Sequence, residues 1–382
     1  MSDNNPQWNP RESKCPMQRD DFDEMRNKCP VAKSDSSKWW VFKHSDIEEI
    51  LEDPETFSSD VSSHLSVPNT MDPPEHTAYR ELIDHYFSEE VLSSFPDDFR
   101  AISEKLVNSA VANDCTEAMG DLGLPYAART QCAFLGWPTD LAETLVTWTL
   151  ENQQAARDQD RDRLAKLAGE FESLVQSVIE QQRNSGQKPP TLTQSLIREK
   201  IDGHRLSLEE LTSIFRNWTV GEVGSLAASI GIILYYLAEC PHIVDHLRQA
   251  DSAEMEDVLD EILRMHGPLV ANRRKATRET TIRGTTIEPG DTIYINWVSA
   301  NRDEEVFGDP DTFDPDGNAE NNLLYGKGIH VCPGAPLARM ELRIFFKELL
   351  EQVTAIELPS KQDIEYAKYP ASGFARLLVC LQ

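Results

Sequence analysis

The amino-acid sequence predicts a mainly α-helical fold with a small, separate β lobe. Helical patterns cover most of the chain, whereas strand patterns are short and confined to a few segments. The longest helical pattern runs from Ser207 to Cys240 and carries almost no charge in its middle. A helix that is apolar on all sides belongs in the interior of a protein. Many helices and few strands therefore indicate a helical body with a minor sheet.

Acidic residues dominate the charge of the chain, with 65 Asp and Glu against 37 Lys and Arg and a net charge of −28. This balance argues against nucleic acid or an anionic membrane as the main partner. No run of 18 or more apolar residues occurs, and residues 1–36 lack the apolar core of a signal peptide. We expect a flexible N-terminal segment, 1–36, followed by one domain, 37–382, without a membrane span.

The seven cysteines are odd in number and form no CxxC pair. They do not predict a disulfide framework or a zinc site with four thiolates. A reducing cytoplasm is the compartment that this pattern favours.

The first half of the chain predicts one short strand, at residues 38–42, and then helices. Residues 45–53 form a helical pattern that a Ser side chain caps and that ends before Pro54. Further helical patterns cover residues 74–88, 95–113 and 138–184.

The central helix has clear limits at both ends. Ser207 and Glu210 form a capping-box pattern, and Pro241 stops the helix. About 33 residues at 1.5 Å each give a length of roughly 50 Å.

The last third predicts a helix at 253–265, strands within 280–297, loops over 302–322, a long helix at 335–353 and a final strand at 375–381. A turn at 289–291 (PGD) separates the strands.

Cys332 lies in a glycine-punctuated loop, YGKGIHVCPG, directly before the last long helix. The N–H groups at the start of that helix favour an anionic thiolate, which is the ligand that a haem iron needs. Taken alone, the loop is equally compatible with an ordinary buried cysteine.

Several charged residues add weaker signals. Glu261 and Arg264 are three apart and share a helix face, as in many surface ion pairs. His76 and Arg80 also share a face, and Arg274 and His330 are further basic residues. These four side chains can bind carboxylates, although each alone is more often a solvated residue.

Together these segments resemble the cytochrome P450 superfamily in its soluble bacterial form. The resemblance covers about residues 40–381. It rests on DPPEHTAYR at 72–80, the long central helix, Glu261 with Arg264, RKAT at 274–277, PGD, ANRDEEVFGDPDTFDP at 300–315 and YGKGIHVCPGAPLAR at 325–339. It implies the triangular, mainly helical cytochrome P450 fold and haem b (iron protoporphyrin IX) as cofactor, with the central helix over the distal face of the haem.

The resemblance also implies roles for single residues. Cys332 is the expected metal ligand, and Gly334 is expected beside the cofactor. Glu261 and Arg264 would form a core network with the region of Asp314. The haem propionates would be bound by four basic residues: His76, Arg80, Arg274 and His330.

The central helix departs from the family pattern, which places an acid and an alcohol over the iron to relay protons. Here the stretch is Val220, Gly221, Glu222, Val223, Gly224 and Ser225, with Val223 at the acid position and Gly224 at the alcohol position. A helix bulge that moves Glu222 or Ser225 into the role is one repair. Water or a polar substrate group beside Gly224 is a second, and the use of peroxide is a third. We therefore expect the catalytic residues within 221–225.

The substrate residues that we expect are Arg216, Val220, Val270 and Asn272, with the loop 61–71 closing the pocket. An Arg on this face of the helix favours a small, polar substrate and either hydroxylation or oxidative O-demethylation. The alternative is that Arg216 reaches solvent or pairs with an acid.

The first functional hypothesis is a dioxygen-using monooxygenase that receives electrons from a separate ferredoxin and ferredoxin reductase, because no GxGxxG motif opens a helix. Arg339, Arg343 and Lys347 would face this acidic partner. The alternatives are a peroxygenase, a haem sensor without turnover, and a thiol enzyme that uses His330 beside Cys332.

Overall fold

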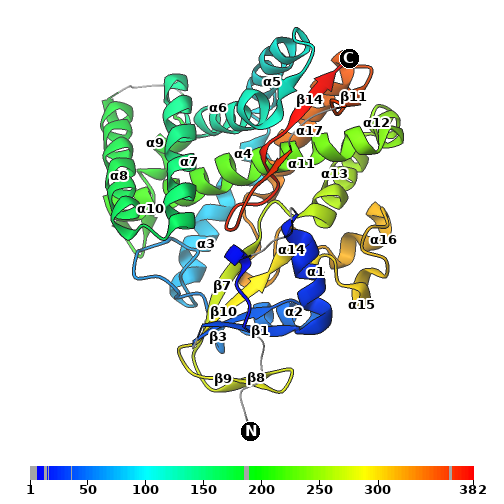
Figure 1. The fold of residues 1–382 in the computed structure, drawn as a ribbon. Coiled ribbons are helices and arrows are strands. Elements are labelled where there is room, and N and C mark those ends of the chain that lie inside the picture. The colour runs from blue at the N-terminus through cyan, green and yellow to red at the C-terminus, as the bar shows by residue number, and fades with distance from the viewer. Residues whose placement is uncertain (1–6, 13–14, 16, 36, 185–188, 361–363) are drawn as a thin grey trace.

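The computed structural model describes residues 7–12, 15, 17–35, 37–184, 189–360 and 364–382. Most of them are helical, and the strands form small sheets, as the sequence predicts. The helical part occupies the upper half of Figure 1, and the largest sheet lies below it. The α-helices are α1 (Gln18–Lys28), α2 (His44–Glu52), α3 (Glu75–Tyr86), α4 (Glu89–Leu92), α5 (Pro96–Val111), α6 (Leu124–Leu135), α7 (Ala142–Asp158), α8 (Arg161–Asn184), α9 (Leu192–Leu196), α10 (Leu208–Thr219), α11 (Ala227–Glu239), α12 (Pro241–Leu247), α13 (Ser252–His266), α14 (Trp297–Ala300), α15 (Glu304–Phe307), α16 (Pro315–Asn318) and α17 (Ala335–Gln352).

The largest sheet has five strands in the order β1-β2-β10-β7-β3. Its strands are β1 (Val31–Asp35), β2 (Lys38–Val41), β3 (Phe57–Ser58), β7 (Ala271–Ala276) and β10 (Thr292–Asn296). β10 pairs with β2 in parallel and with β7 in antiparallel orientation, where Ile293 lies opposite Arg274. The smaller sheets are β11-β14-β4 (Ile356–Glu357, Leu378–Leu381, Thr116–Glu117), β12-β13 (Glu365–Tyr366, Phe374–Arg376), β5-β6 (Lys200–Ile201, His204–Arg205) and β8-β9 (Thr280–Ile282, Thr285–Ile287).

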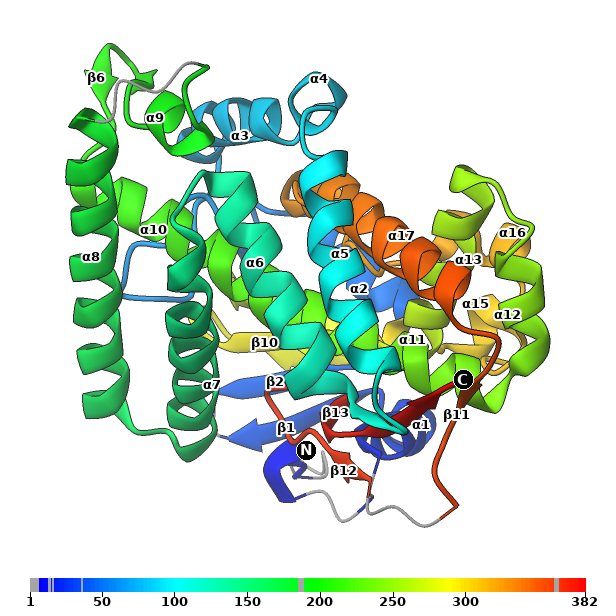
Figure 2. The same cartoon turned by 90° about the horizontal axis from the view of Figure 1, so that it is seen from above.

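The central helix consists of α10, the π-helical segment η4 (Val220–Leu226) and α11. The predicted capping box is present, because Ser207 accepts a bond from the Glu210 N–H and Glu210 accepts one from the Ser207 N–H. Both views place α10 and α11 on one line through the helical part, with α6 and α17 near it (Figures 1 and 2). In the part of the chain that the structure describes, Leu208–Glu239 is the one helix long and apolar enough to cross a membrane. Most of its apolar window is buried inside the protein, as in the core helix of a globular fold.

Two predicted helix boundaries were wrong. The predicted Ser45 cap is not used, because α2 begins at His44 and the distant Asp303 carboxylate accepts the His44 N–H at 2.9 Å. The pattern at 138–184 is two helices, α7 and α8, because Gln159 adopts a left-handed conformation with a φ of 57° between them.

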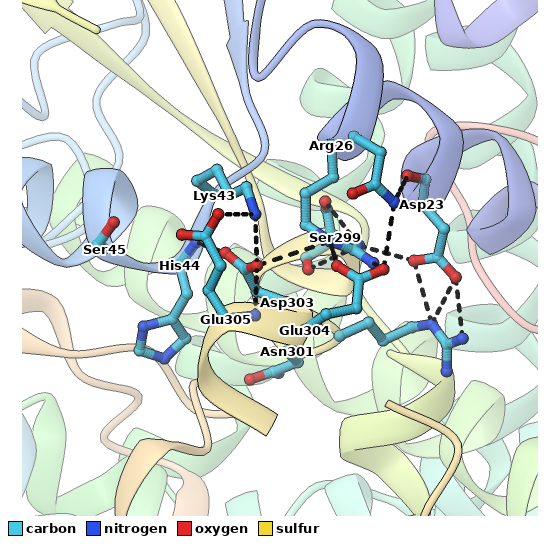
Figure 3. A network of polar contacts seen from close by, with 12 residues as sticks. Asp23, Arg26, Lys43, His44, Ser45, Ser299, Asn301, Asp303, Glu304 and Glu305 are labelled. Atoms are coloured by element: carbon cyan, nitrogen blue, oxygen red, sulfur yellow. Dashed lines mark hydrogen bonds and ion pairs between the residues drawn. The ribbon is translucent and has the colours of Figure 1, made fainter. Parts of the chain in front are cut away.

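The described residues of the N-terminal segment, 7–12, 15 and 17–35, include folded elements, whereas we expected a flexible segment over 1–36. Residues 1–6, 13, 14, 16 and 36 lie outside the described residues, but α1 and β1 fold onto the domain. Arg26 of α1 is fully buried and donates to Asp23, Glu304 and the Ser299 carbonyl (Figure 3). Lys43 bonds Asp303 and Glu305 in the same network. A local pattern could not show this order, because Ser299 and Glu304, two of the partners of Arg26, lie 273 and 278 residues away.

One cysteine prediction is also corrected, because Cys115 and Cys380 form a disulfide. The two residues are 265 positions apart and come together beside the paired strands β4 and β14. Sequence spacing gives no sign of this pair, since strand pairing alone brings the two ends of the chain together. The remaining described cysteines, Cys332 among them, are free.

Candidate functional site

The middle of the central helix borders open space. Val220 is 40% exposed, and a Cβ built on Gly221 would meet no atom within 4 Å. The exposed residues lie between two buried parts of the helix. Ile214 and Phe215 pack in one apolar cluster on the N-terminal side, and Ile230 packs in another on the C-terminal side. The π turn lies at the same place, so the helix bulge expected as one repair is present in the structure.

Cys332 lies at the start of α17, at the end of a tightly turned loop. Gly326 and Gly328 adopt positive φ angles of 75° and 71°, and a Cβ on Gly328 would lie 2.5 Å from the Leu51 carbonyl oxygen. A longer side chain therefore cannot replace Gly328 without moving the backbone. The Cys332 N–H donates to the Tyr325 carbonyl at 2.8 Å, which closes the loop. The thiol stands free at an exposed position.

The surroundings of the Cys332 thiol oppose and favour ionisation at once. Burial among protein atoms raises its pKa, whereas the backbone N–H groups of Gly334 and Ala335 and the Arg80 charge lower it. Cys332 is surrounded by many protein atoms and yet has exposed surface, because its thiol lies deep in the molecule and borders open space. Two N–H groups aimed at one sulfur stabilise a thiolate ligand once a cation neutralises it.

Four basic side chains from three separate segments converge near this loop. His76 and His330 face each other with ring centroids 4.4 Å apart. Nε2 of each ring is buried and has no hydrogen-bond partner among the described residues. Burial lowers the pKa of Arg274 to about 10, with Asp72 as the nearby acid. Arg80 donates to the Ile329 carbonyl at 3.0 Å and pairs with Asp84.

Glu261 and Arg264 form a buried, two-pronged ion pair in α13, with N–O distances of 2.7 and 2.9 Å. Glu261 also accepts bonds from the Asp314 N–H and from Asn318. Arg264 donates to the Asn301 carbonyl at 2.7 Å. The pair therefore ties α13 to the loops on both sides of α15, at the place where we expected a core network.

The residues so arranged belong to a known architecture. A model of the family "Cytochrome P450" matches residues 137–368, which is more than half of the chain. The chain is a member of the cytochrome P450 family.

Known relatives of this cytochrome P450 match it along most of its length. Linalool 8-monooxygenase of Pseudomonas putida is 30% identical, with 90% of each chain covered. The putative cytochrome P450 YjiB of Bacillus subtilis is 28% identical, with 90% of this chain and 89% of that protein covered. Among solved structures, a mutant of P450 EryK in complex with erythromycin B superimposes with a TM-score of 0.85 at 25% identity, with 95% of each chain covered. The protein is thus an oxidoreductase of the cytochrome P450 monooxygenase type.

The haem of this family is compatible with the residues that are present. Two buried histidine nitrogens without partners, beside a desolvated Arg274, form a place for anionic carboxylates such as haem propionates. Cys332 supplies a thiol beside two backbone N–H groups, which is the donor that the family uses for iron. We assign His76, Arg80, Arg274 and His330 to the propionates, and Cys332 to the iron, as proposals.

Not every expected substrate residue reaches the open space. Val270 is 0% exposed and packs in an apolar cluster with Phe22 and Val298, so the structure contradicts its assignment. Successive side chains of an extended segment point to opposite sides. The neighbour Leu269 is therefore 41% exposed where Val270 is buried. Asn272 is exposed, and its Oδ1 accepts a bond from Trp297 Nε1 at 3.4 Å.

The residues expected to catalyse do not all face the same way. Val223, at the acid position, is fully buried in an apolar cluster. Gly224, at the alcohol position, lies next to α7, and a Cβ there would be 3.2 Å from Gln153 Nε2. Ser225 accepts a bond at its carbonyl from the Ser229 hydroxyl at 2.8 Å. Glu222 points toward Glu341 of α17 and Thr130 of α6.

Sequence reasoning missed two residues, Gln153 and Glu341. Gln153 lies on α7, far from the central helix in sequence, so only the fold brings its amide to Gly224. Glu341 had a local signal, because it is a charged residue in the apolar stretch of α17. A charge on a buried helix face is an observation that the sequence alone could have raised.

Proposed function

We propose that this cytochrome P450 is a dioxygen-using monooxygenase that holds haem b and oxidises a small, polar organic substrate. In hydroxylation, dioxygen, two electrons and two protons convert a C–H bond to C–OH and release one water. In O-demethylation, the same insertion into a methoxy group gives a hemiacetal, which releases formaldehyde and leaves an alcohol. When bound, the haem iron supplies the activation of dioxygen.

The observation that carries the substrate class is Arg216 on the central helix. Its guanidinium donates to the Leu65 carbonyl at 2.7 Å, and burial lowers its pKa. No ion pair involves Arg216 in the described part of the chain, so the alternative of an acidic partner has no support there. A half-buried cation with donors to spare favours a ligand with oxygen acceptors or negative charge.

We propose that four further side chains line the substrate space beside the central helix. Val220 and Leu269 have exposed apolar surface, and Asn272 and Gln153 carry amide groups. A few polar groups within an apolar lining fix the orientation of a small ligand. Ser213 fastens the loop 61–71 to the central helix, because its hydroxyl accepts the Val67 N–H and donates to the Leu65 carbonyl.

The relatives do not supply the substrate. Linalool 8-monooxygenase and the erythromycin C-12 hydroxylase of Saccharopolyspora erythraea are named for two very different molecules, and both are about equally similar to this chain. The substrate must therefore be inferred from residues that belong to this chain, such as Arg216.

For electrons we propose a separate ferredoxin and ferredoxin reductase. The expected docking residues give limited support, because Arg339 pairs with Asp260 and Arg343 with Glu256, both at 2.7 Å. Only Lys347 of the three is an exposed residue outside these pairs. We also propose a cytoplasmic location, although the disulfide removes part of the cysteine argument for a reducing compartment.

A ligand screen by haem spin-state shift tests the substrate class. Methoxy sugars and methoxy aromatics should shift the spectrum of the holoprotein, and terpenes and fatty acids should bind more weakly. Arg216→Gln should weaken the polar ligands about ten- to a hundred-fold, as expected for a lost charged hydrogen bond. Arg205→Gln, in an exposed hairpin, is the matched control. Binding of large apolar ligands alone would exclude a polar substrate.

A peroxygenase on the same fold is the second candidate. It is favoured by one observation, since Val223 and Gly224 leave the central helix without the acid–alcohol pair that dioxygen use normally requires. Product formation with hydrogen peroxide and no reductant, at a rate equal to or above that of the ferredoxin-driven reaction, would decide for it.

A further inference from the structure

The loop that carries Cys332 is tied to α2 by ion pairs. Lys327 of this loop lies 2.6 Å from Glu48 and 3.1 Å from Glu52, both on α2. The loop and α2 are also in direct contact, since a Cβ on Gly328 would lie 2.5 Å from a backbone oxygen of α2. The charge of Lys327 is therefore more than matched by two acids of the neighbouring helix.

A second cation lies on the same loop and is matched in the same way. The Arg339 guanidinium of α17 stacks over the Tyr325 ring, with 4.6 Å between its central carbon and the ring centroid. The Tyr325 carbonyl accepts the Cys332 N–H, so Arg339 lies against the Cys332 loop. Asp260 of α13 pairs with Arg339 at 2.7 Å and accepts a bond from the Tyr325 hydroxyl at 3.2 Å. The Asp260 side chain is only 13% exposed, and breaking a largely buried pair is costly.

The row of cations continues along α17. Arg343 pairs with Glu256 of α13 at 2.7 Å, and Asp257 is a further exposed acid beside this pair in sequence. Lys347 is exposed, and Glu351 lines the same surface cavity. The acids are thus at least as numerous as the cations, and the row has no net positive charge. We call the row of cations with the acids beside it the α17 surface: Lys327, Arg339, Arg343 and Lys347.

The charge of this surface decides which partners it attracts. Attraction over long distances depends on the summed charge of a region, so a cation that an acid matches adds almost nothing to it. The chain as a whole has a net charge of −28. An acidic protein that approaches the α17 surface would therefore be repelled, whereas a basic one would be attracted.

An electron donor has a reason to approach this surface. The electron must reach the iron that we assign to Cys332, and the Cys332 loop and α17 are joined to that residue by the chain itself. The open space beside Val220 of the central helix is where we place the substrate. The α17 surface therefore remains for the donor.

We propose that the electron donor of this cytochrome P450 docks on the α17 surface, and that the docking face of the donor carries Lys and Arg rather than Asp and Glu. This inference rests on the proposed use of a separate electron donor. In each docking event one electron passes from the donor to the haem, so the donor is oxidised and the haem is reduced. The exposed acids of the α17 surface, such as Glu52 and Asp257, would pair with the basic residues of the donor.

Titration calorimetry of the haem-loaded protein tests the docking charge without electron transfer. The probes are a bacterial ferredoxin with acidic residues beside its iron–sulfur cluster, and a variant of it in which Lys replaces those residues. At pH 8 and about 10 mM salt, where charges act over about 30 Å, the Lys variant should bind at least about ten-fold more tightly. At about 100 mM salt most of this difference should be lost. Equal binding of the two probes, or tighter binding of the acidic one, would overturn the proposal.

Removing acids from the α17 surface should reverse the preference. The double variant Glu52→Gln, Glu256→Gln leaves Lys327 with one acid and frees Arg343 from its pair. It should bind the Lys variant of the ferredoxin at least about three-fold more weakly than wild type. The acidic ferredoxin should reduce its haem at least about three-fold faster than that of wild type, as followed by the reduced carbonyl spectrum at low salt.

The matched control makes the same change in net charge elsewhere. Glu151→Gln, Glu170→Gln releases Arg163 and Lys166 from ion pairs on α7 and α8. Both views place α8 at the opposite edge of the molecule from α13 (Figures 1 and 2). This control should bind both probes, and be reduced, as wild type is. Equal effects in the two double variants would show that only the total charge matters and would overturn the assignment to the α17 surface.

The failure of the proposed function would look different. If neither ferredoxin reduces the haem and product forms only with peroxide, the proposed use of dioxygen fails. The calorimetric titration still decides the charge of the docking face, because it needs no electron transfer.

Discussion

The rings of His76 and His330 face each other at 4.4 Å, and the Nε2 atom of each is buried without a partner among the described residues. One ring comes from α3 and the other from the loop before Cys332, so the contact joins two segments about 250 residues apart. A protein does not normally bury two such nitrogens unless a ligand completes them. The contact therefore marks the position where we place the haem propionates.

Replacing both histidines should loosen the haem. In His76→Phe, His330→Phe the propionates lose two hydrogen bonds to charged groups, each worth about 1.5–3 kcal/mol. Haem should pass to an excess of a haem-scavenging apoprotein at least about a hundred-fold faster than from wild type. His204→Phe, in an exposed hairpin, is the control. Equal rates of haem loss in all three proteins would exclude the propionate assignment.

Breaking the buried ion pair of α13 should destabilise the whole domain. Arg264→Leu leaves Glu261 charged and buried, which costs about 3–5 kcal/mol of unfolding free energy. Arg100→Leu removes a partly exposed pair and should cost no more than about 1 kcal/mol. Denaturant titrations of both holoproteins measure the difference. A loss of less than about 1 kcal/mol for Arg264→Leu would show that the pair is not structural.

The disulfide should stabilise the protein in the oxidised state. Cys115 and Cys380 close a loop of 265 residues, and such a bond typically contributes about 2–4 kcal/mol. Addition of a reductant should lower the melting temperature of wild type. The variant Cys115→Ser should melt at the temperature of the reduced wild type, whether or not reductant is present. A wild type that does not respond, and that shows two free thiols at these positions, would contradict the bond.

His266 predicts a dependence of stability on acid. Burial, with help from the Arg19 charge, lowers its pKa from 6.5 to about 3 in the folded protein. Between these pH values the unfolded state binds the proton more strongly, so this group makes the unfolding free energy fall as the pH falls from about 6.5 toward 3. His266→Gln removes the titration and keeps an acceptor for Arg19, which lies 3.0 Å away.

The stability of the variant relative to wild type should therefore rise as the pH is lowered through this range. Denaturant titrations at several pH values measure that difference. A difference that stays constant from pH 7 to pH 4 would show that His266 titrates normally.

The parts of the fold that the sequence predicted well are those with local signals. The capping box of Ser207 and Glu210 and the loop around Cys332 lie within a few residues, and both appear where we expected them. Contacts between distant segments could not be read in this way. Asp303 caps α2 in place of Ser45, and Val270 is buried where Leu269 is exposed, because the fold decides which neighbour provides the partner.

In the candidate site, too, features with a local sequence signal could be predicted and contacts between distant segments could not. The helix bulge was one of three repairs that the sequence allowed, and the structure contains it at residues 220–226. The carboxyl of Glu341 and the amide of Gln153 come from α17 and α7, so neither could be placed beside the central helix before the packing was known.

The reduced carbonyl spectrum tests the central claim, that the Cys332 sulfur binds a haem iron. The purified, haem-replete protein is reduced and exposed to carbon monoxide, and the position of its main absorption band is recorded. We predict the long-wavelength band of a thiolate-bound haem in wild type, and its loss in Cys332→Ala. A Cys332→Ala variant with an unchanged spectrum, or a wild type that binds no haem, would contradict the account.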